Sequence, residues 1–284
     1  MARVAIVTDS TADLPPSLRD QHHVTVVPLN VHFGNEVYRD QVDITTDAFM
    51  ERLQRSPVLP TTSQPASGLF EETFRDLAAD HDGVVAVLIS GKLSGTVMSA
   101  TIARDAVADL VPVEVVDSRN ASLGLGFQVL RAAELAAEGM SAPDIAARLQ
   151  SETAAYHLVF FVDTLEYLQR GGRIGKAAAM VGSMLNLKPL LRVDEGQIVP
   201  FERTRTRGRA RRGLIDFARS LPRTERLAVV HSTPAAEAEQ LAAELSATAL
   251  LPRDRMVVAQ FGPVIGTHVG PGAMGVGVYE GETS

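Results

Sequence analysis

Short, almost entirely apolar runs alternate with amphipathic stretches along the chain, and this alternation limits the possible fold more than any other feature. Short runs rich in valine and isoleucine are typical of strands buried on both faces. In the first half they occupy residues 4–8, 24–29, 84–90 and 113–116. The stretches with helical periodicity are residues 46–53, 69–79, 99–110 and 123–137. This order predicts a largely parallel sheet with helices on its faces.

The second half repeats the pattern, which predicts a second unit of the same class. We expect a strand at residues 157–162 and then a helix ending at Arg170-Gly171-Gly172, where a glycine can take the left-handed cap. Further strands are expected at residues 190–193, 198–201, 227–231 and 256–261. The length of 284 residues suits two domains. The prediction is two α/β domains with largely parallel sheets, residues 1–156 and 157–284.

Composition excludes several classes of function. The formal net charge of −7 repels nucleic acid, so no nucleic acid partner is expected. The absence of cysteine excludes thiolate chemistry, and the histidines lack the helical spacing of metal ligands, so no metal site is expected. Asp9 interrupts the N-terminal apolar run, and no later run approaches the ~18 apolar residues of a membrane span. We therefore expect a cytoplasmic protein.

Two glycine-rich segments resemble nucleotide-binding loops but are incomplete. Residues 270–275 satisfy G-x-G-x-x-G, but the chemistry also needs a following helix and an acidic residue about twenty positions later. Residues 171–176 resemble part of a phosphate-binding loop, but Arg170 replaces a required glycine and Ala177 replaces the Mg²⁺-binding hydroxyl residue. The sequence therefore predicts no bound cofactor.

Hydroxyl groups and one histidine lie where predicted strands end, which is where open α/β sheets bind ligands. The four segments are Thr8-Asp9-Ser10-Thr11, Thr61-Thr62-Ser63-Gln64, Leu93-Ser94-Gly95-Thr96 and Ile265-Gly266-Thr267-His268. Hydroxyl and helix-start N–H groups donate hydrogen bonds to an anion, and a histidine adds a donor that can carry charge near neutral pH. Each segment alone is typical of a cap or turn, but together they indicate a carboxylate site.

The same residues leave a hydrolase open as an alternative, namely a Ser/His esterase or thioesterase. Ser94 would be the nucleophile and His268 the base, with Asp9 or Asp117 orienting the ring. Residues 91–96 nevertheless lack the glycines of the G-x-S-x-G turn. A run of six arginines between residues 203 and 212 leaves a third possibility, a module that binds acidic proteins or nucleic acid.

Five segments, in order along essentially the whole chain, resemble the DegV family of bacterial fatty-acid-binding proteins. They are residues 7–15 (VTDSTADLP), 62–65 (TSQP), 93–96 (LSGT), 165–174 (LEYLQRGGRI) and 262–272 (GPVIGTHVGPG). The resemblance implies that a long-chain fatty acid lies between the domains, with its carboxylate bound by residues matching Thr62, Ser94 and His268. A second set of polar and small residues would support this site: Ser63, Asp9, Ser10, Gly95 and Gly266.

The resemblance also implies a partner. Such proteins present the fatty acid to a separate kinase subunit, which holds ATP and phosphorylates the carboxylate, and they then carry the acyl phosphate toward phospholipid synthesis. This chain would not be catalytic alone, and a transient contact with a membrane or an acyltransferase is compatible with the role. Residues matching Arg170 and one arginine of the run, for which we favour Arg205, would act in phosphate transfer or partner contact.

The tail of the fatty acid would need an apolar pocket. Methionines suit this role because they adapt to a flexible chain, although all such residues are also typical of an ordinary core. The candidates for the tail pocket are Phe160, Phe161, Met180, Met184 and Leu185.

Overall fold

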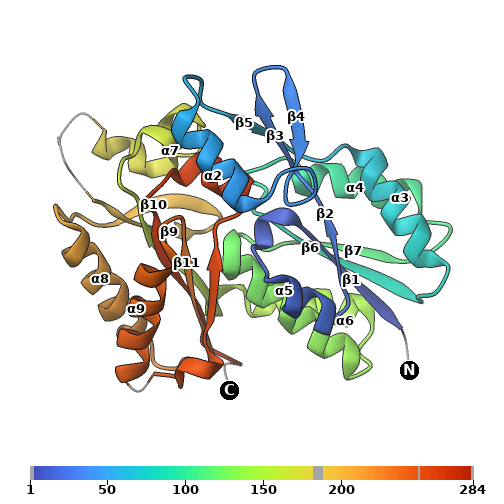
Figure 1. Cartoon of the computed structure of the whole chain (residues 1–284). Helices are drawn as coiled ribbons and strands as arrows, with labels where there is room; N and C mark the ends of the chain where they lie inside the picture. The colour runs from blue at the N-terminus through green and yellow to red at the C-terminus, as the bar shows by residue number, and fades with distance from the viewer. Residues whose placement is uncertain (1–2, 182–187, 249, 283–284) are drawn as a thin grey trace.

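The computed structural model describes residues 3–181, 188–248 and 250–282. Two sheets with their helices lie side by side, and a small third sheet extends from the first (Figure 1). We call the chain through α6 (Ala142–Ser151) the first half and the chain from β8 (Tyr156–Phe161) onward the second half. The α/β class is confirmed, whereas the division at residue 156 stays a prediction.

The first sheet is entirely parallel, as the sequence predicts. Its strands β1 (Val4–Asp9), β2 (Val24–Val27), β6 (Gly83–Leu88) and β7 (Val113–Asp117) have the order β2-β1-β6-β7. One face packs against α3 (Ser67–Ala78) and α4 (Thr96–Ala106), and the other against α5 (Ser122–Ala137) and α6 (Ala142–Ser151). Alternate residues of each strand face the two layers, which explains why the strands are apolar throughout.

The second sheet corrects the expectation of largely parallel strands. Its strands are β8 (Tyr156–Phe161), β9 (Leu190–Asp194), β10 (Gln197–Glu202), β11 (Arg226–His231), β12 (Val257–Gln260) and β13 (Met274–Tyr279). They have the order β10-β9-β8-β13-β11-β12, and among these described strands only β11 and β12 pair in parallel. Strand β13 is antiparallel to both of its neighbours, and β9 is antiparallel to both β8 and β10. The glycines of β13 interrupt the continuous apolar pattern from which the other strands were predicted, so this strand was not expected from the sequence.

Helix α5 joins the two sheets. All but four of its residues are buried, because one side packs on β1 and β6 and the other on β8 and β13. The opposite face of the second sheet is covered by α8 (Arg207–Ser220) and α9 (Ala235–Ala247). The main core therefore runs through both halves instead of being divided between them.

A third sheet was not predicted, because its strands are short and partly polar. It contains β3 (Asn30–Phe33), β4 (Glu36–Arg39) and β5 (Thr61–Ser63) in the order β4-β3-β5, all antiparallel. Helix α2 (Thr46–Arg55) and, from the second half, α10 (Pro263–Val269) pack beside it. This crossing brings the C-terminal polar segment to the first half.

The remaining elements are short. They are the helices α1 (Pro16–Gln21) and α7 (Glu166–Arg170) and the 3₁₀ turns η1 (Ser10–Ala12), η2 (Thr153–Ala155), η3 (Gly175–Met180) and η4 (Arg253–Arg255). Within the described ranges, none of the helices combines the length and apolar composition needed to cross a lipid bilayer.

Because α5 supports both sheets, we expect Leu125→Ala to lower the free energy of unfolding by about 2–5 kcal/mol. Leu125 is fully buried in α5, so the change leaves a cavity. Leu110→Ala is the matched control, since Leu110 is half exposed and its truncation should cost less than about 0.5 kcal/mol. Urea unfolding measures both. Equal losses would contradict the central role of α5.

Candidate functional site

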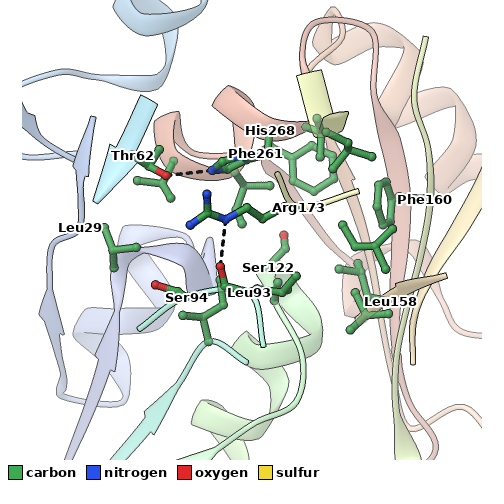
Figure 2. A pocket seen from close by; sticks show the side chains of 18 of the residues that line it. Leu29, Thr62, Leu93, Ser94, Ser122, Leu158, Phe160, Arg173, Phe261 and His268 are labelled. Carbon is green, nitrogen blue, oxygen red and sulfur yellow. Dashed lines mark hydrogen bonds between the residues drawn. The ribbon is translucent and has the colours of Figure 1, made fainter. Parts of the chain in front are cut away.

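A pocket of about 220 Å³ lies between the two halves (Figure 2). Its apolar walls come largely from the second half: Leu158, Phe160, Leu168, Val193, Ile198 and Phe261. Polar side chains gather toward the other side of the pocket, where Thr62, Ser94, Arg173 and His268 lie away from Leu158 and Phe160. We call these the polar end and the apolar end. The arrangement suits an elongated ligand with one polar group.

The polar end is built around a contact between the halves. Thr62 of β5 and His268 of α10 are hydrogen-bonded, with 2.8 Å between Oγ1 and Nε2. Helix α10 starts after Gly262 with Pro263 at its first position, which suits the fixed φ of proline. The structure therefore brings together two of the three residues proposed for the carboxylate.

Gly171 makes room for the histidine. A Cβ atom at Gly171 would lie 2.2 Å from Nδ1 of His268, so a side chain there would displace the ring. The left-handed glycine at the end of α7 is Gly172, with φ of +69°, whereas Gly171 has a helical conformation. The two glycines thus have separate purposes, one for the turn and one for the site.

His268 is neutral near pH 7, although a histidine can carry charge there. Burial, and with it the positive charge of Arg173, lowers the pKa of His268 to about 4. A neutral imidazole has a single N–H. Nε2 of His268 therefore either donates to the Thr62 hydroxyl or accepts a hydrogen bond from it, depending on the tautomer. The positive charge of the polar end therefore comes from Arg173.

Ser94 lies in the loop between β6 and α4. Its Oγ is 2.8 Å from Oγ1 of Thr96, the first residue of α4. Gly95 precedes that helix, and a Cβ there would collide with the side chain of Gln64, which also lines the pocket. Ser94 thus joins Thr62 and His268 at one pocket.

Arg173 is the residue at the polar end that sequence analysis missed. Its Nε donates to the carbonyl of Leu93 (3.1 Å) and its Nη1 to that of Gly171 (2.7 Å), which holds the guanidinium between Ser94 and His268 (Figure 2). The segment Arg170-Gly171-Gly172-Arg173 offers two arginines, and nothing in their spacing distinguishes them. Only the turn at Gly172 shows which one faces inward.

The arginines named from the sequence lie elsewhere. Arg170 is exposed and pairs with Glu166 at 2.8 Å, and Arg205 is exposed just before α8. Arg207 of the same run pairs with Asp163 and Glu237 and is therefore structural. Neither Arg170 nor Arg205 lines the pocket, so their role in transfer or partner contact stays a prediction.

A buried carboxylate, that of Asp13, stabilises the segments next to the polar end. Asp13 accepts hydrogen bonds from the Ser122 hydroxyl (2.6 Å) and the Gly262 amide (2.9 Å), which ties the start of α5 to the start of α10. Ser122 itself lines the pocket, although sequence analysis did not single it out. Burial raises the pKa of Asp13 well above its usual range, despite these two hydrogen bonds.

Of the second set of polar and small residues predicted to support the carboxylate site, some line the pocket and others lie behind it. Ser63 lines the pocket and lies 2.9 Å from Nε2 of His32. Asp9 accepts from the amides of Thr11 and Ile89, and the Ser10 hydroxyl accepts from the amide of Leu29. Asp9 and Ser10 therefore fix the backbone of Ile89 and Leu29, which line the pocket, but do not line it themselves.

Gly266, another member of the second set, contributes to helix packing and not to the pocket lining. A Cβ at Gly266 would lie 2.9 Å from the ring of Phe49 in α2. The absence of a side chain therefore lets α10 approach α2 closely.

Of the three tail-pocket candidates that lie within the described residues, Phe160 alone is in the pocket wall. Phe161 is its neighbour in β8 and so faces the other side of the sheet, where Arg207 lies 5.1 Å from its ring centre. Met180 is buried in the adjoining core without lining the pocket. Met184 and Leu185 lie outside the described residues.

The hydrolase arrangement is not assembled. His268 is bonded to Thr62, while Ser94 is bonded to Thr96. Asp9 holds the amide of Ile89, and Asp117 accepts from the amide of Arg119. A nucleophile must be hydrogen-bonded to its base, and the base to its orienting acid, so the geometry gives no support to this alternative.

The fold and pocket define a two-part α/β protein with a ligand pocket between the parts. The family model described as "Uncharacterised protein, DegV family" matches residues 3–281. Protein DegV of Bacillus subtilis is 39% identical over 279 residues, covering 96% of this chain and 98% of its own. A DegV domain-containing protein of Streptomyces coelicolor is 41% identical over 284 residues, covering 96% and 97%. This chain belongs to the DegV family.

Solved structures agree with this assignment. A Thermus thermophilus DegV family protein described by its fatty acid binding superposes with a TM-score of 0.90 at 39% identity, covering 98% of this chain and 99% of its own. DegV of Bacillus subtilis, described as a fatty acid binding protein, gives a TM-score of 0.85 at 37% identity, with coverage of 98% and 100%.

The first prediction from the site concerns His268. Its ring should stay neutral from pH 8 down to about pH 5 in the ligand-free protein, because burial and Arg173 both disfavour the imidazolium. Nitrogen-15 NMR of histidine-labelled protein, assigned with His268→Gln, measures this directly. A transition near pH 6.5 for this ring would contradict the proposed environment.

The second concerns Asp40, which lies close to Asp13 and Gly262. Burial is the main cause that raises the pKa of Asp40 to about 7. The charge of Asp9 also raises it, whereas Ser10, the Val264 amide and Arg19 act to lower it. The folded state thus holds this proton more tightly than the unfolded state. Its stabilising effect is complete below about pH 4 and is lost as the pH rises through about 7.

Asp40→Asn should remove this loss, which is on the order of 4 kcal/mol between pH 4 and pH 8. Urea unfolding of both proteins at several pH values measures it. Comparing the variant with the wild type cancels the opposite slope of His268, whose lowered pKa makes stability rise with pH below about 6.5. Parallel pH profiles would show that Asp40 does not titrate as described.

Proposed function

We propose that this chain binds one long-chain fatty acid, with the carboxylate at the polar end and the tail at the apolar end. The observation that carries the proposal is the pocket itself, in which four hydrogen-bonding side chains lie opposite an apolar wall. Family members from Thermus thermophilus and Bacillus subtilis are described as binding fatty acids, and one from Eubacterium ventriosum, 27% identical with a TM-score of 0.88, as binding stearic acid.

The tail supplies most of the affinity. Each buried CH₂ group contributes about 0.8 kcal/mol, so a long chain retains the ligand while the polar end fixes its direction. Arg173 offsets the charge of the carboxylate, and the hydroxyls of Thr62 and Ser94 donate to its oxygens. Neutral His268 can orient the Thr62 hydroxyl without adding a second positive charge.

We further propose that a separate kinase subunit, which holds ATP, phosphorylates the carboxylate while this chain holds the acyl group. The acyl phosphate would then pass toward phospholipid synthesis. The incomplete nucleotide-binding segments and the lack of an assembled hydrolase triad support a carrier that is not catalytic alone. The exposed guanidinium groups of Arg170 and Arg205 suit contact with the partner or the phosphate.

The test compares two arginines three residues apart. Arg173→Gln should weaken the retention of palmitic acid about 10- to 100-fold, because it removes a charge-assisted hydrogen bond. Arg170→Gln is the matched control and should retain the ligand, since its side chain faces solvent. Mass spectrometry after organic extraction, with titration of delipidated protein, measures both. A wild type that neither contains nor takes up fatty acid would refute the function, and equal effects would refute the site.

A further inference from the structure

The tip of the β9–β10 hairpin forms part of the apolar end. Val193 and Ile198 stand on either side of the turn at residues 194–197, and both line the pocket. Pairing between β8 and β9 ends with Val159 and Arg192, so the tip projects beyond the part of β9 that its own sheet holds. Contacts from outside the sheet must therefore fix its position.

The second half contributes through η3, where Gly175 lies against the backbone of Ile198, and the turn itself is contacted by the first half. Ser90, two residues after the end of β6, is fully buried, and its hydroxyl donates to the carbonyl of Gly196 at 2.8 Å. Lys92 donates to the carbonyl of Glu195 at 2.8 Å, and Arg119 pairs with the Glu195 carboxylate at 3.2 Å, both nearer to solvent. The buried bond from Ser90 is the better protected of the three from competing water.

The fit at Ser90 is tight. Gly196 has φ of +76°, and a Cβ atom there would lie 2.4 Å from the Ser90 hydroxyl oxygen. Glu195 also has positive φ, which gives the two-residue turn that matches the twist of paired strands. Glycine at position 196 thus serves both the turn and the approach of Ser90.

A second cavity, of about 370 Å³, lies behind the tip. Val193 and Leu158 line both this cavity and the acyl pocket, so they form the partition between the two. Asp194 and Glu195 at the tip face the second cavity. If the tip moved, the two spaces would join and the apolar end would become deeper.

We propose that Ser90, acting through Gly196, holds the hairpin tip as the end wall of the acyl pocket and thereby limits the length of the bound chain. Ser90 is a positioning residue, since it acts through the tip and does not line the pocket. The inference rests on the proposed binding of a fatty acid, and it adds what determines the preferred chain length.

The test is the relative affinity of delipidated protein for arachidic and palmitic acids, which differ only in length. Ser90→Ala frees the tip and should raise the ratio in favour of arachidic acid about fifteenfold, since burying two of its four additional CH₂ groups gives about a fourfold gain for each. Ser118→Ala is the matched control: Ser118 is equally buried and also donates to a backbone carbonyl, but within its own loop. Its ratio should equal that of the wild type.

Gly196→Ala provides a second variant of the same contact. It should shift the ratio in the same direction, and less so in the Ser90→Ala background, where the hydroxyl that it would meet is gone. Unchanged ratios in both single variants, in a protein that binds palmitic acid, would overturn the inference alone. A wild type that binds neither acid would instead overturn the proposed function.

Discussion

The hydrogen bond between Thr62 and His268 is the contact on which the rest of the site depends. It joins a strand of the small sheet to α10, which crosses from the second half of the chain. Around it, Gly171 leaves space for the ring, Gly266 lets α10 approach Phe49, and Asp13 holds the start of α10. Several constraints from both halves thus act on one imidazole, which keeps the polar end preorganised.

Charge at this site is controlled by burial. The ring of His268 is neutral and the guanidinium of Arg173 is held by two backbone carbonyls, so one permanent positive charge faces the pocket. The buried carboxyls of Asp9, Asp13 and Asp40 all have raised pKa values because they are removed from water. An anionic ligand therefore meets Arg173 without a matching negative charge among the described residues that line the pocket.

The sequence predicts the parallel half better than the antiparallel one, for physical reasons. Buried parallel strands are continuous apolar runs, and those of β1, β6 and β7 stand out for that reason. Strand β13 alternates glycine with larger residues, and β3 to β5 are short and partly polar, so none has such a pattern. The direction of a strand depends on the connections between elements, which periodicity does not report.

The prediction of the site residues from the sequence was limited in the same way. Thr62, Ser94 and His268 were predicted from hydroxyls at strand ends and from the resemblance, and the structure brings them to one pocket. The choice between Arg170 and Arg173 depends on a turn at Gly172, and that between Phe160 and Phe161 on which face of β8 meets the pocket. Such choices follow from three-dimensional packing and not from residue type.

Carbon-13 NMR of bound palmitic acid labelled at its carboxyl carbon tests the proposed orientation of the ligand. We expect one bound resonance that stays ionised below the usual carboxylic pKa, with magnetisation transfer to protons of Thr62 and His268. A bound carboxyl that titrates as it does in water, without contact to either residue, would show that the acid lies the other way round or at another site.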